Sequence, residues 1–129
     1  MQSSIEPFKE LIAVFSEDAG FEVSAHLNYQ NLYINQLESE TNEFMLRLSN
    51  KHFLTVARIS FLHQRNGFGT KVLEWLKAYG IKNGYENIMF ESVLTIEMKT
   101  FLVKNGFELL YPNSINWILP VKSGSSEGF

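Results

Sequence analysis

The hydrophobic positions of the first twenty residues follow a helical period. Four large apolar side chains recur at the i, i+3, i+4, i+7 spacing of an amphipathic helix, namely Phe8, Leu11, Ile12 and Phe15. Ser3 and Glu6 have the spacing of a capping box, and Gly20 is a suitable helix stop. The pattern therefore predicts one helix that ends at Gly20 and packs through its apolar stripe.

After this helix the period shortens to about two residues, which is typical of strands. Alternation is clearest in 43–49, where three apolar residues share one face and Met45 and Arg47 share the other. The run 53–62 is apolar on both faces, as in a central strand, and Asn50-Lys51 fits a hairpin turn between the two segments. The strands predicted for this antiparallel meander are 21–28, 32–37, 43–49 and 53–62.

After residue 63 helical and extended patterns alternate. The predicted elements are a helix over 68–83, a strand over 87–92, a helix from Thr95 to Asn105, and strands over 107–111 and 116–121. A strand, a helix and a second strand in succession form a βαβ unit, so strands 53–62 and 87–92 should be parallel. We therefore expect an α/β (α+β) domain with a mixed, mostly antiparallel sheet and about three helices.

Composition narrows the classes of function. The 129 residues suit a single domain, expected over 1–122, with a flexible Ser/Gly-rich tail at 123–129. A net charge of −3 argues against a nucleic-acid scaffold, and the absence of cysteine removes disulfides and thiolate metal ligands. No apolar run approaches the roughly 20 residues needed to cross a bilayer. We expect a globular cytoplasmic protein with no metal site, nucleic-acid partner or membrane segment.

The junction between strand 53–62 and the next helix has the chemistry of an anion site. The segment Gln64-Arg65-Asn66-Gly67-Phe68-Gly69-Thr70 places two glycines directly before the helix. Glycine lets another group approach the backbone closely, and the first amides of a helix lack intrahelical partners and carry partial positive charge. These features suit a phosphate group, although a plain tight turn is the alternative interpretation.

This loop and one later element resemble the GNAT superfamily of N-acetyltransferases. The superfamily motif is Gln/Arg-x-x-Gly-x-Gly/Ala at a strand-to-helix junction, and the segment from Gln64 to Gly69 matches each specified position. The helix before Gly106-Phe107 is similar to a GNAT helix that ends in a Gly-Phe pair, and the resemblance covers residues 53–111. It implies the GNAT (acyl-CoA N-acyltransferase) fold, in which the parallel strand pair splays apart.

The resemblance also implies acetyl-coenzyme A (acetyl-CoA) as co-substrate. In GNAT enzymes the pantetheine arm pairs with backbone groups at the end of the strand before the loop, and the pyrophosphate rests on the loop amides. A primary amine then attacks the thioester directly, without a covalent enzyme intermediate. Carried onto this sequence, the implied binding residues are Ile59, Ser60, Phe61, Gln64, Arg65, Asn66, Gly67, Phe68, Gly69, Thr70 and Thr95.

Two positions depart from the GNAT pattern. Many members carry a Tyr four residues before the Gly of the Gly-Phe pair, placed to protonate the coenzyme A thiolate, and this sequence has Leu102 there. Many also carry an Asn that touches pantetheine, where this sequence has Thr95. Leucine has no proton to give, so the usual general acid is missing. A thiolate with an ordinary pKa of about 8.5 can still leave without full protonation.

Other polar residues near the predicted site are candidates for chemistry. Glu91 ends strand 87–92 and could be the general base for the amine, or a solvated strand-end carboxylate. Tyr111 could replace the missing tyrosine, or be an edge-strand aromatic. His63 could act as a base or be an ordinary loop residue. Arg58, in an otherwise apolar strand, is expected to have a carboxylate partner.

The leading hypothesis is an acetyl-CoA-dependent N-acetyltransferase, monomeric or homodimeric, with a small-molecule or peptide amine as acceptor. Leu102 favours the alternative, a GNAT-like module that binds acyl-CoA or a protein partner without catalysis. Transfer of an acyl group longer than acetyl is a third hypothesis. The acidic residues Glu38, Glu40 and Glu43 could attract a cationic amine, or form a solvated stretch.

Overall fold

The computed structural model describes residues 5–20, 23–36, 39–59 and 67–121. Its helices are α1 (Lys9–Ala19), which follows a 3₁₀ turn at Glu6–Phe8, α2 (Phe68–Lys82) and α3 (Ile96–Lys104). Its strands are β1 (Ser24–Asn28), β2 (Asn31–Gln36), β3 (Ser39–Arg47), β4 (Phe53–Ile59), β5 (Asn87–Phe90), β6 (Glu108–Leu109) and β7 (Trp117–Pro120). The order of helices and strands is the predicted one.

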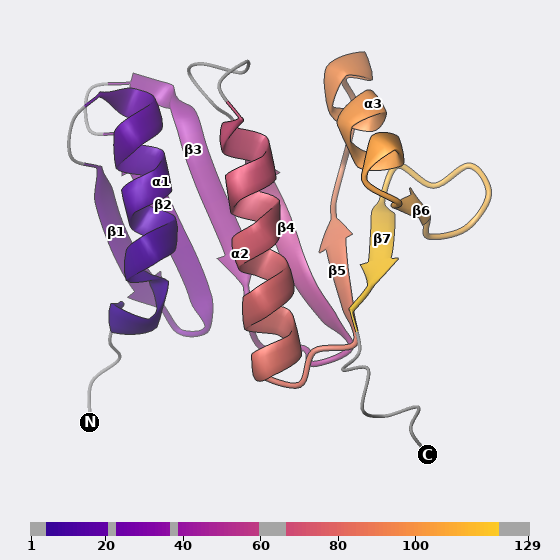
Figure 1. The fold of residues 1–129 in the computed structure, drawn as a ribbon, viewed down its shortest axis with the longest axis horizontal. Coiled ribbons are helices and arrows are strands. Elements are labelled where there is room, and N and C mark those ends of the chain that lie inside the picture. Colours follow the sequence, from indigo (N-terminus) through magenta and orange to yellow (C-terminus); the bar gives the residue numbers. More distant parts are fainter. Residues whose placement is uncertain (1–4, 21–22, 37–38, 60–66, 122–129) are drawn as a thin grey trace.

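The strands form one mixed sheet with the order β1-β2-β3-β4-β5-β7-β6 (Figure 1). Neighbouring strands run antiparallel except β4 and β5, where Phe53–Val56 pairs in parallel with Asn87–Phe90. Helix α2 makes the crossover between these two strands, so the parallel pair predicted from the βαβ order is confirmed.

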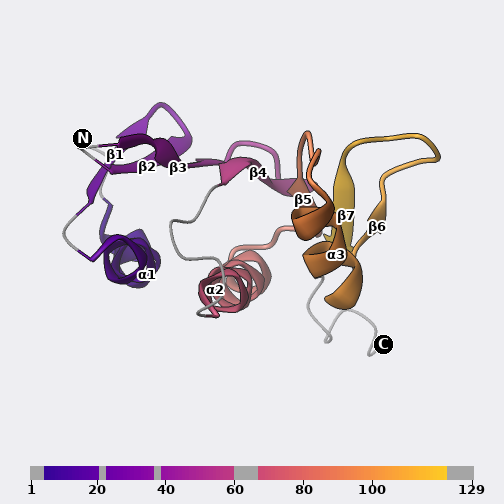
Figure 2. The same cartoon turned by 90° about the horizontal axis from the view of Figure 1, so that it is seen from above.

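Helices α1 and α2 lie side by side on one face of the sheet, and α3 stands beyond α2 near β5 and β7 (Figures 1 and 2). Among the described elements, no helix covers the opposite face of β1 to β4, which we call the outer face. The alternation along β3 follows this division. Phe44 and Leu46 are fully buried toward the helices, whereas on the outer face Met45 is half-buried and Arg47 is exposed.

The core lies between the sheet and the helices α1 and α2. Its most deeply buried apolar side chains include Leu11, Phe15, Leu32, Ile34, Phe44, Leu46, Leu54, Leu73, Leu76 and Ile88. Gly80 of α2 is buried against the sheet, and a Cβ there would make ordinary van der Waals contacts, at 3.4 Å from Val121 Cγ2 and 3.7 Å from Leu54 Cδ2.

Element ends differ from prediction where tertiary pairing decides them. β3 begins at Ser39 rather than residue 43, because its ladder with β2 continues past a register shift at Asn35/Gln36. β6 has only two residues, because Phe107 turns into the core and Leu110 N donates to Asn116 O at the base of a loop. The proposed cap Ser3 and the tail 123–129 lie outside the described residues. No helix in the described ranges is long and apolar enough to cross a membrane.

Candidate functional site

β4 and β5 part halfway along β4. Their parallel register ends at Val56 opposite Phe90, and the last hydrogen bond runs from Glu91 N to Val56 O at 3.0 Å. β4 continues to Ile59, whereas the segment that follows β5 turns away at Ser92, which has a φ of 55°. Val93 N then donates to Ile115 O at 2.8 Å, which holds this segment toward the β6–β7 loop. The two strands therefore diverge as a splayed pair.

A β-bulge in β4 coincides with this divergence. Met45 of β3 lies opposite Arg58, but its neighbour Leu46 lies opposite Val56, so Ala57 is the extra residue. A bulge bends its strand and changes where the following side chains point. It places Arg58 on the outer face beside Met45, while Ile59 packs against the core.

A cavity of about 760 Å³ opens where the two strands diverge. The residues that line it are Met45, Arg47, Val56, Ala57, Arg58, Ile59, Phe90, Glu91, Ser92, Val93, Leu94, Thr95 and Met98. The lining combines Met45 and Arg47 of the outer face with Val56 and Phe90, whose side chains are buried. It is mixed in character, with apolar residues beside charged and hydroxyl side chains.

The main polar contact in this cavity is an ion pair between Arg47 and Glu91. Arg47 Nη1 donates to Glu91 Oε1 at 2.9 Å and to Oε2 at 3.0 Å. Arg47 is on β3 and Glu91 follows β5, so the arginine side chain crosses β4 to reach its partner. The sequence predicted Glu91 as a candidate base here but missed Arg47. Its place on the outer face of β3 was visible in the alternation, whereas its partner was not.

Among the described residues, no side chain caps the backbone amides in the first turn of α2. Gly67 is the N-cap residue, with a φ of 76°, and the first turn carries no acidic residue. A Cβ built on Gly67 would meet no atom within 4 Å, so a ligand could approach this backbone without a clash. Thr70 is exposed and Phe68 is buried. Five predicted binding residues, and His63 as well, lie outside the described residues: Ser60, Phe61, Gln64, Arg65 and Asn66.

No protein-family model matches the sequence, and no curated protein matches it either. Solved structures do match over nearly the whole chain. A GNAT-family acetyltransferase from Staphylococcus aureus Mu50 superposes with a TM-score of 0.56 at 14% identity, covering 95% of this chain and 98% of that one.

An acetyltransferase from Thermus thermophilus gives a TM-score of 0.55 at 16% identity, with coverage of 92% and 93% of the two chains. The ribosomal-protein-S18-alanine N-acetyltransferase from Escherichia coli gives a TM-score of 0.54 at 18% identity, with coverage of 95% and 94%. The chain has the GNAT fold. At these identities the likeness concerns the fold, and the chemistry must be argued from this chain's own residues.

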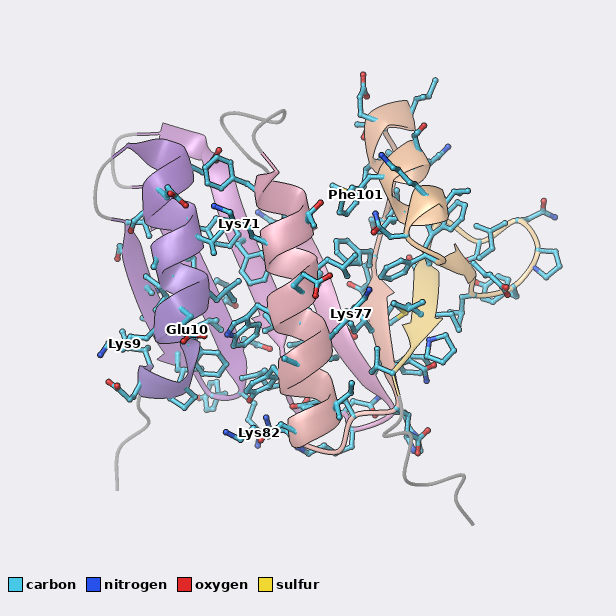
Figure 3. The ribbon with its side chains drawn as sticks, viewed as in Figure 1. Lys9, Glu10, Lys71, Lys77, Lys82 and Phe101 are labelled. Carbon is cyan, nitrogen blue, oxygen red and sulfur yellow. The ribbon has the colours of Figure 1, made fainter. Side chains whose placement is uncertain are left out.

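Within this GNAT fold, Gly69 has a packing role that the sequence motif did not reveal. A Cβ on Gly69 would stand 3.2 Å from Cζ and 3.3 Å from Cε1 of Phe101, so the ring of α3 occupies the space beside α2 (Figure 3). On the other side of α2, Lys71 pairs with Glu17 of α1, with 3.1 Å between Lys71 Nζ and Glu17 Oε1 (Figure 3). The first turn of α2 is therefore fixed from both sides.

Three further positions singled out from the sequence are Thr95, Leu102 and Tyr111, and only the first of them lines the cavity of this GNAT fold. Thr95 lines it, and its hydroxyl accepts a hydrogen bond from Met98 N at 3.2 Å, which caps the N-terminus of α3. Leu102 is fully buried in the core and is not part of the lining. Tyr111 is 59% exposed in the β6–β7 loop and also lies outside the lining. The structure brings Ile59, Glu91 and Thr95 together but not Tyr111.

Proposed function

We propose that this chain is an acetyl-CoA-dependent N-acetyltransferase that acetylates a primary amine. The observation that carries the proposal is the divergence of β4 and β5 after Val56 and Phe90, with a cavity at the gap and the carboxylate of Glu91 on its wall. A strand pair that opens in this way leaves room for an extended ligand beside β4 and for a second substrate from the other face of the sheet. The GNAT fold supports the same activity.

The residues present fit acetyl-CoA, which would supply the acetyl thioester. Within the described part of the chain the first α2 amides have no side-chain cap, and the first turn holds no acidic residue, so these amides favour an anionic pyrophosphate. The open approach at Gly67 fits close contact with a phosphate oxygen. We propose that the pyrophosphate is held by the segment from Gln64 to Thr70 and that Ile59, Ser60, Phe61 and Thr95 contact the pantetheine arm.

In the transfer step the nitrogen of the acceptor attacks the thioester carbonyl carbon. The C–N bond forms, the C–S bond breaks, and the thiolate leaves with the bonding electrons. The proton lost by the nitrogen passes to the carboxylate of Glu91, directly or through one water, and solvent protonates the thiolate. Glu91 is well placed for this role because it lines the cavity with its carboxylate only partly exposed.

One observation favours a second candidate, a GNAT-like module that binds acyl-CoA without catalysis. Leu102 is fully buried, and the cavity lining in the described ranges carries only three strongly ionisable side chains, those of Arg47, Arg58 and Glu91. None is suited to protonate a thiolate, because both guanidiniums hold their protons too strongly and the carboxylate is the proposed base. A catalytic reaction would then depend on solvent to protonate the coenzyme A thiolate.

The experiment that separates these candidates combines turnover with binding. The protein is incubated with acetyl-CoA and a panel of primary amines while free thiol is followed, and acetyl-CoA alone is titrated by calorimetry. Turnover supports the transferase. Binding without turnover supports the module, and failure to bind acetyl-CoA contradicts both.

A further inference from the structure

We propose that Arg47 is a positioning residue for the transfer step. Its guanidinium holds the carboxylate of Glu91 in the orientation in which that carboxylate takes the proton of the acceptor nitrogen. This inference rests on the proposed transferase function and adds a residue that acts through the base rather than on a substrate. The observations that carry it are the contact between the two side chains, the anchored backbone at Glu91 and the path of Arg47 across β4.

The contact between Arg47 and Glu91 consists of two hydrogen bonds from one nitrogen. Arg47 Nη1 donates to Glu91 Oε1 at 2.9 Å and to Oε2 at 3.0 Å. In the part of the chain that the structure describes, neither side chain has another hydrogen-bond or ion-pair partner. A carboxylate offers about four lone-pair sites, so one nitrogen that bridges both oxygens leaves sites for the amine or a water. The contact therefore orients the carboxylate without saturating it.

The backbone at Glu91 is anchored, so its side-chain torsions are the freedom that the ion pair removes. The amides of residues 91–93 donate in turn to Val56 O at 3.0 Å, Asn116 Oδ1 at 2.9 Å and Ile115 O at 2.8 Å. These bonds tie the turn to β4 on one side and to the segment before β7 on the other. A glutamate side chain loses conformational entropy when it is ordered. Because the ion pair orders it beforehand, this loss is not added to the barrier of the transfer step.

Arg47 reaches Glu91 by crossing β4 on the outer face. β4 lies between β3 and β5 in the sheet, and Thr55 of β4 is directly opposite Arg47. Thr55 is only 5% exposed, although no described helix covers this face. The apolar stem of an arginine can cover a neighbouring side chain while its charged end stays in water. A stem of Arg47 that lies across Thr55 fits this burial, together with Met89, the neighbour of Thr55 on β5.

The same ion pair is expected to add little to folding. The side chains of Arg47 and Glu91 are 46% and 26% exposed, and ion pairs this accessible to water contribute little net stability. Replacement of Arg47 should therefore spare the fold and change the transfer step. Misplacement of a reacting group by about 1 Å can cost about 10²-fold in rate. We thus expect kcat to fall by about 10- to 100-fold, without a change in KM for acetyl-CoA.

The test is a double-mutant cycle on kcat. Transfer of radiolabelled acetyl from acetyl-CoA to the best amine of the panel is measured for the wild type, Arg47→Met, Glu91→Gln and the double variant, over times long enough to detect losses of about 10⁴-fold. Arg47→Met should lower kcat in the wild type. In the Glu91→Gln background it should change kcat by less than about twofold, because the group that it positions is gone. Arg47→Lys, which keeps a cation on a flexible stem, should lose less than Arg47→Met.

Lys82→Met is the matched control, because Lys82 is an exposed cation in the last turn of α2 and does not line the cavity (Figure 3). It should leave kcat unchanged. Thermal unfolding verifies that each variant is folded, and Arg47→Gln replaces Arg47→Met if the latter is not.

Two outcomes overturn the positioning role but uphold the transferase. One is a kcat for Arg47→Met equal to that of the control, or a loss that is the same in the wild type and in the Glu91→Gln background. The other is a change confined to KM for the amine, which would mean that Arg47 contacts the acceptor instead. If the wild type acetylates no amine of the panel, the transferase fails and this inference fails with it.

Discussion

The ring of Phe101 lies tightly against Gly69, and a Cβ at residue 69 would stand only 3.2 Å from Phe101 Cζ. Two helices separated in sequence by β5 thus meet at the turn proposed to hold pyrophosphate. A side chain at the second glycine of the Gly-x-Gly pair would therefore displace the Phe101 ring by a few tenths of an ångström, whatever ligand the turn binds.

Gly69→Ala should therefore destabilise the contact between α2 and α3. Insertion of a methyl group into a filled site costs about 1–3 kcal/mol, and the better helix propensity of alanine offsets at most about 1 kcal/mol of it. We expect a Tm lower by about 3–6 °C in calorimetry. Thr70→Ala, at an exposed position of the same turn, is the control. Adding Phe101→Leu should recover most of the loss, and an unchanged Tm for Gly69→Ala would contradict the contact.

Gly67→Glu should abolish acetyl-CoA binding while the fold persists. The new carboxylate would stand against the proposed pyrophosphate, and the positive φ of 76° adds backbone strain of about 1–2 kcal/mol. Gly67→Gln is the matched control, because it carries the same strain without the charge. Calorimetric titration should give at least a tenfold weaker affinity for the Glu variant than for the Gln variant. Equal affinities would place the pyrophosphate elsewhere.

Glu91→Gln should remove the proposed base with little effect on the fold. Loss of a general base lowers kcat by about 10²- to 10⁴-fold. The lost ion pair with Arg47 is partly exposed, so the free energy of unfolding should change by about 1 kcal/mol or less. Steady-state kinetics and thermal unfolding measure the two effects. The control is Glu97→Gln, an exposed acid of α3 outside the lining, and a kcat for Glu91→Gln equal to that of the control would exclude Glu91 as the base.

Tyr85 should make stability depend on pH at the alkaline end. Burial, with a smaller contribution from neighbouring Tyr79, raises the pKa of Tyr85 from 10.0 to about 12, and its hydroxyl donates to Leu48 O. Below pH 10 the phenol is neutral in both the folded and the unfolded chain, so its contribution to stability is complete. Between pH 10 and 12 only the unfolded chain releases the proton, and the free energy of unfolding should fall by up to about 1.4 kcal/mol per pH unit.

Urea unfolding between pH 8 and 12 measures this dependence. In Tyr85→Phe the slope above pH 10 should be smaller, though not zero, because burial also raises the pKa of Tyr79. The same slope in both proteins would show that Tyr85 ionises equally in the folded and unfolded states.

The sequence predicts this fold well where a pattern is local. The apolar stripe of α1 and the alternation of β3 each depend on neighbouring residues, and the parallel pair follows from connectivity alone. The start of β3 was misplaced by four residues, since it depends on a register shift in β2 that leaves no local signal.

The site was predicted less completely for the same physical reason. Glu91 was a candidate because it ends a strand, but its partner Arg47 is 44 residues away and meets it only because β4 lies between their strands. Gly69 was assigned to ligand approach from a motif, and its contact with Phe101 requires the docking of two helices. The contact between Arg47 and Glu91 depends on the order of strands in the sheet, and the contact between Gly69 and Phe101 depends on the docking of α3 on α2.

The division of the sheet into two faces has a consequence for how such a protein can change over evolution. Met45, Arg47 and Arg58, which line the cavity, lie on the outer face, while Phe44, Leu46 and Val56 are buried on the other. Substitutions at residues 45, 47 and 58 can therefore alter acceptor preference with little penalty in the core. A laboratory library confined to these three positions should contain many folded proteins with different substrate ranges.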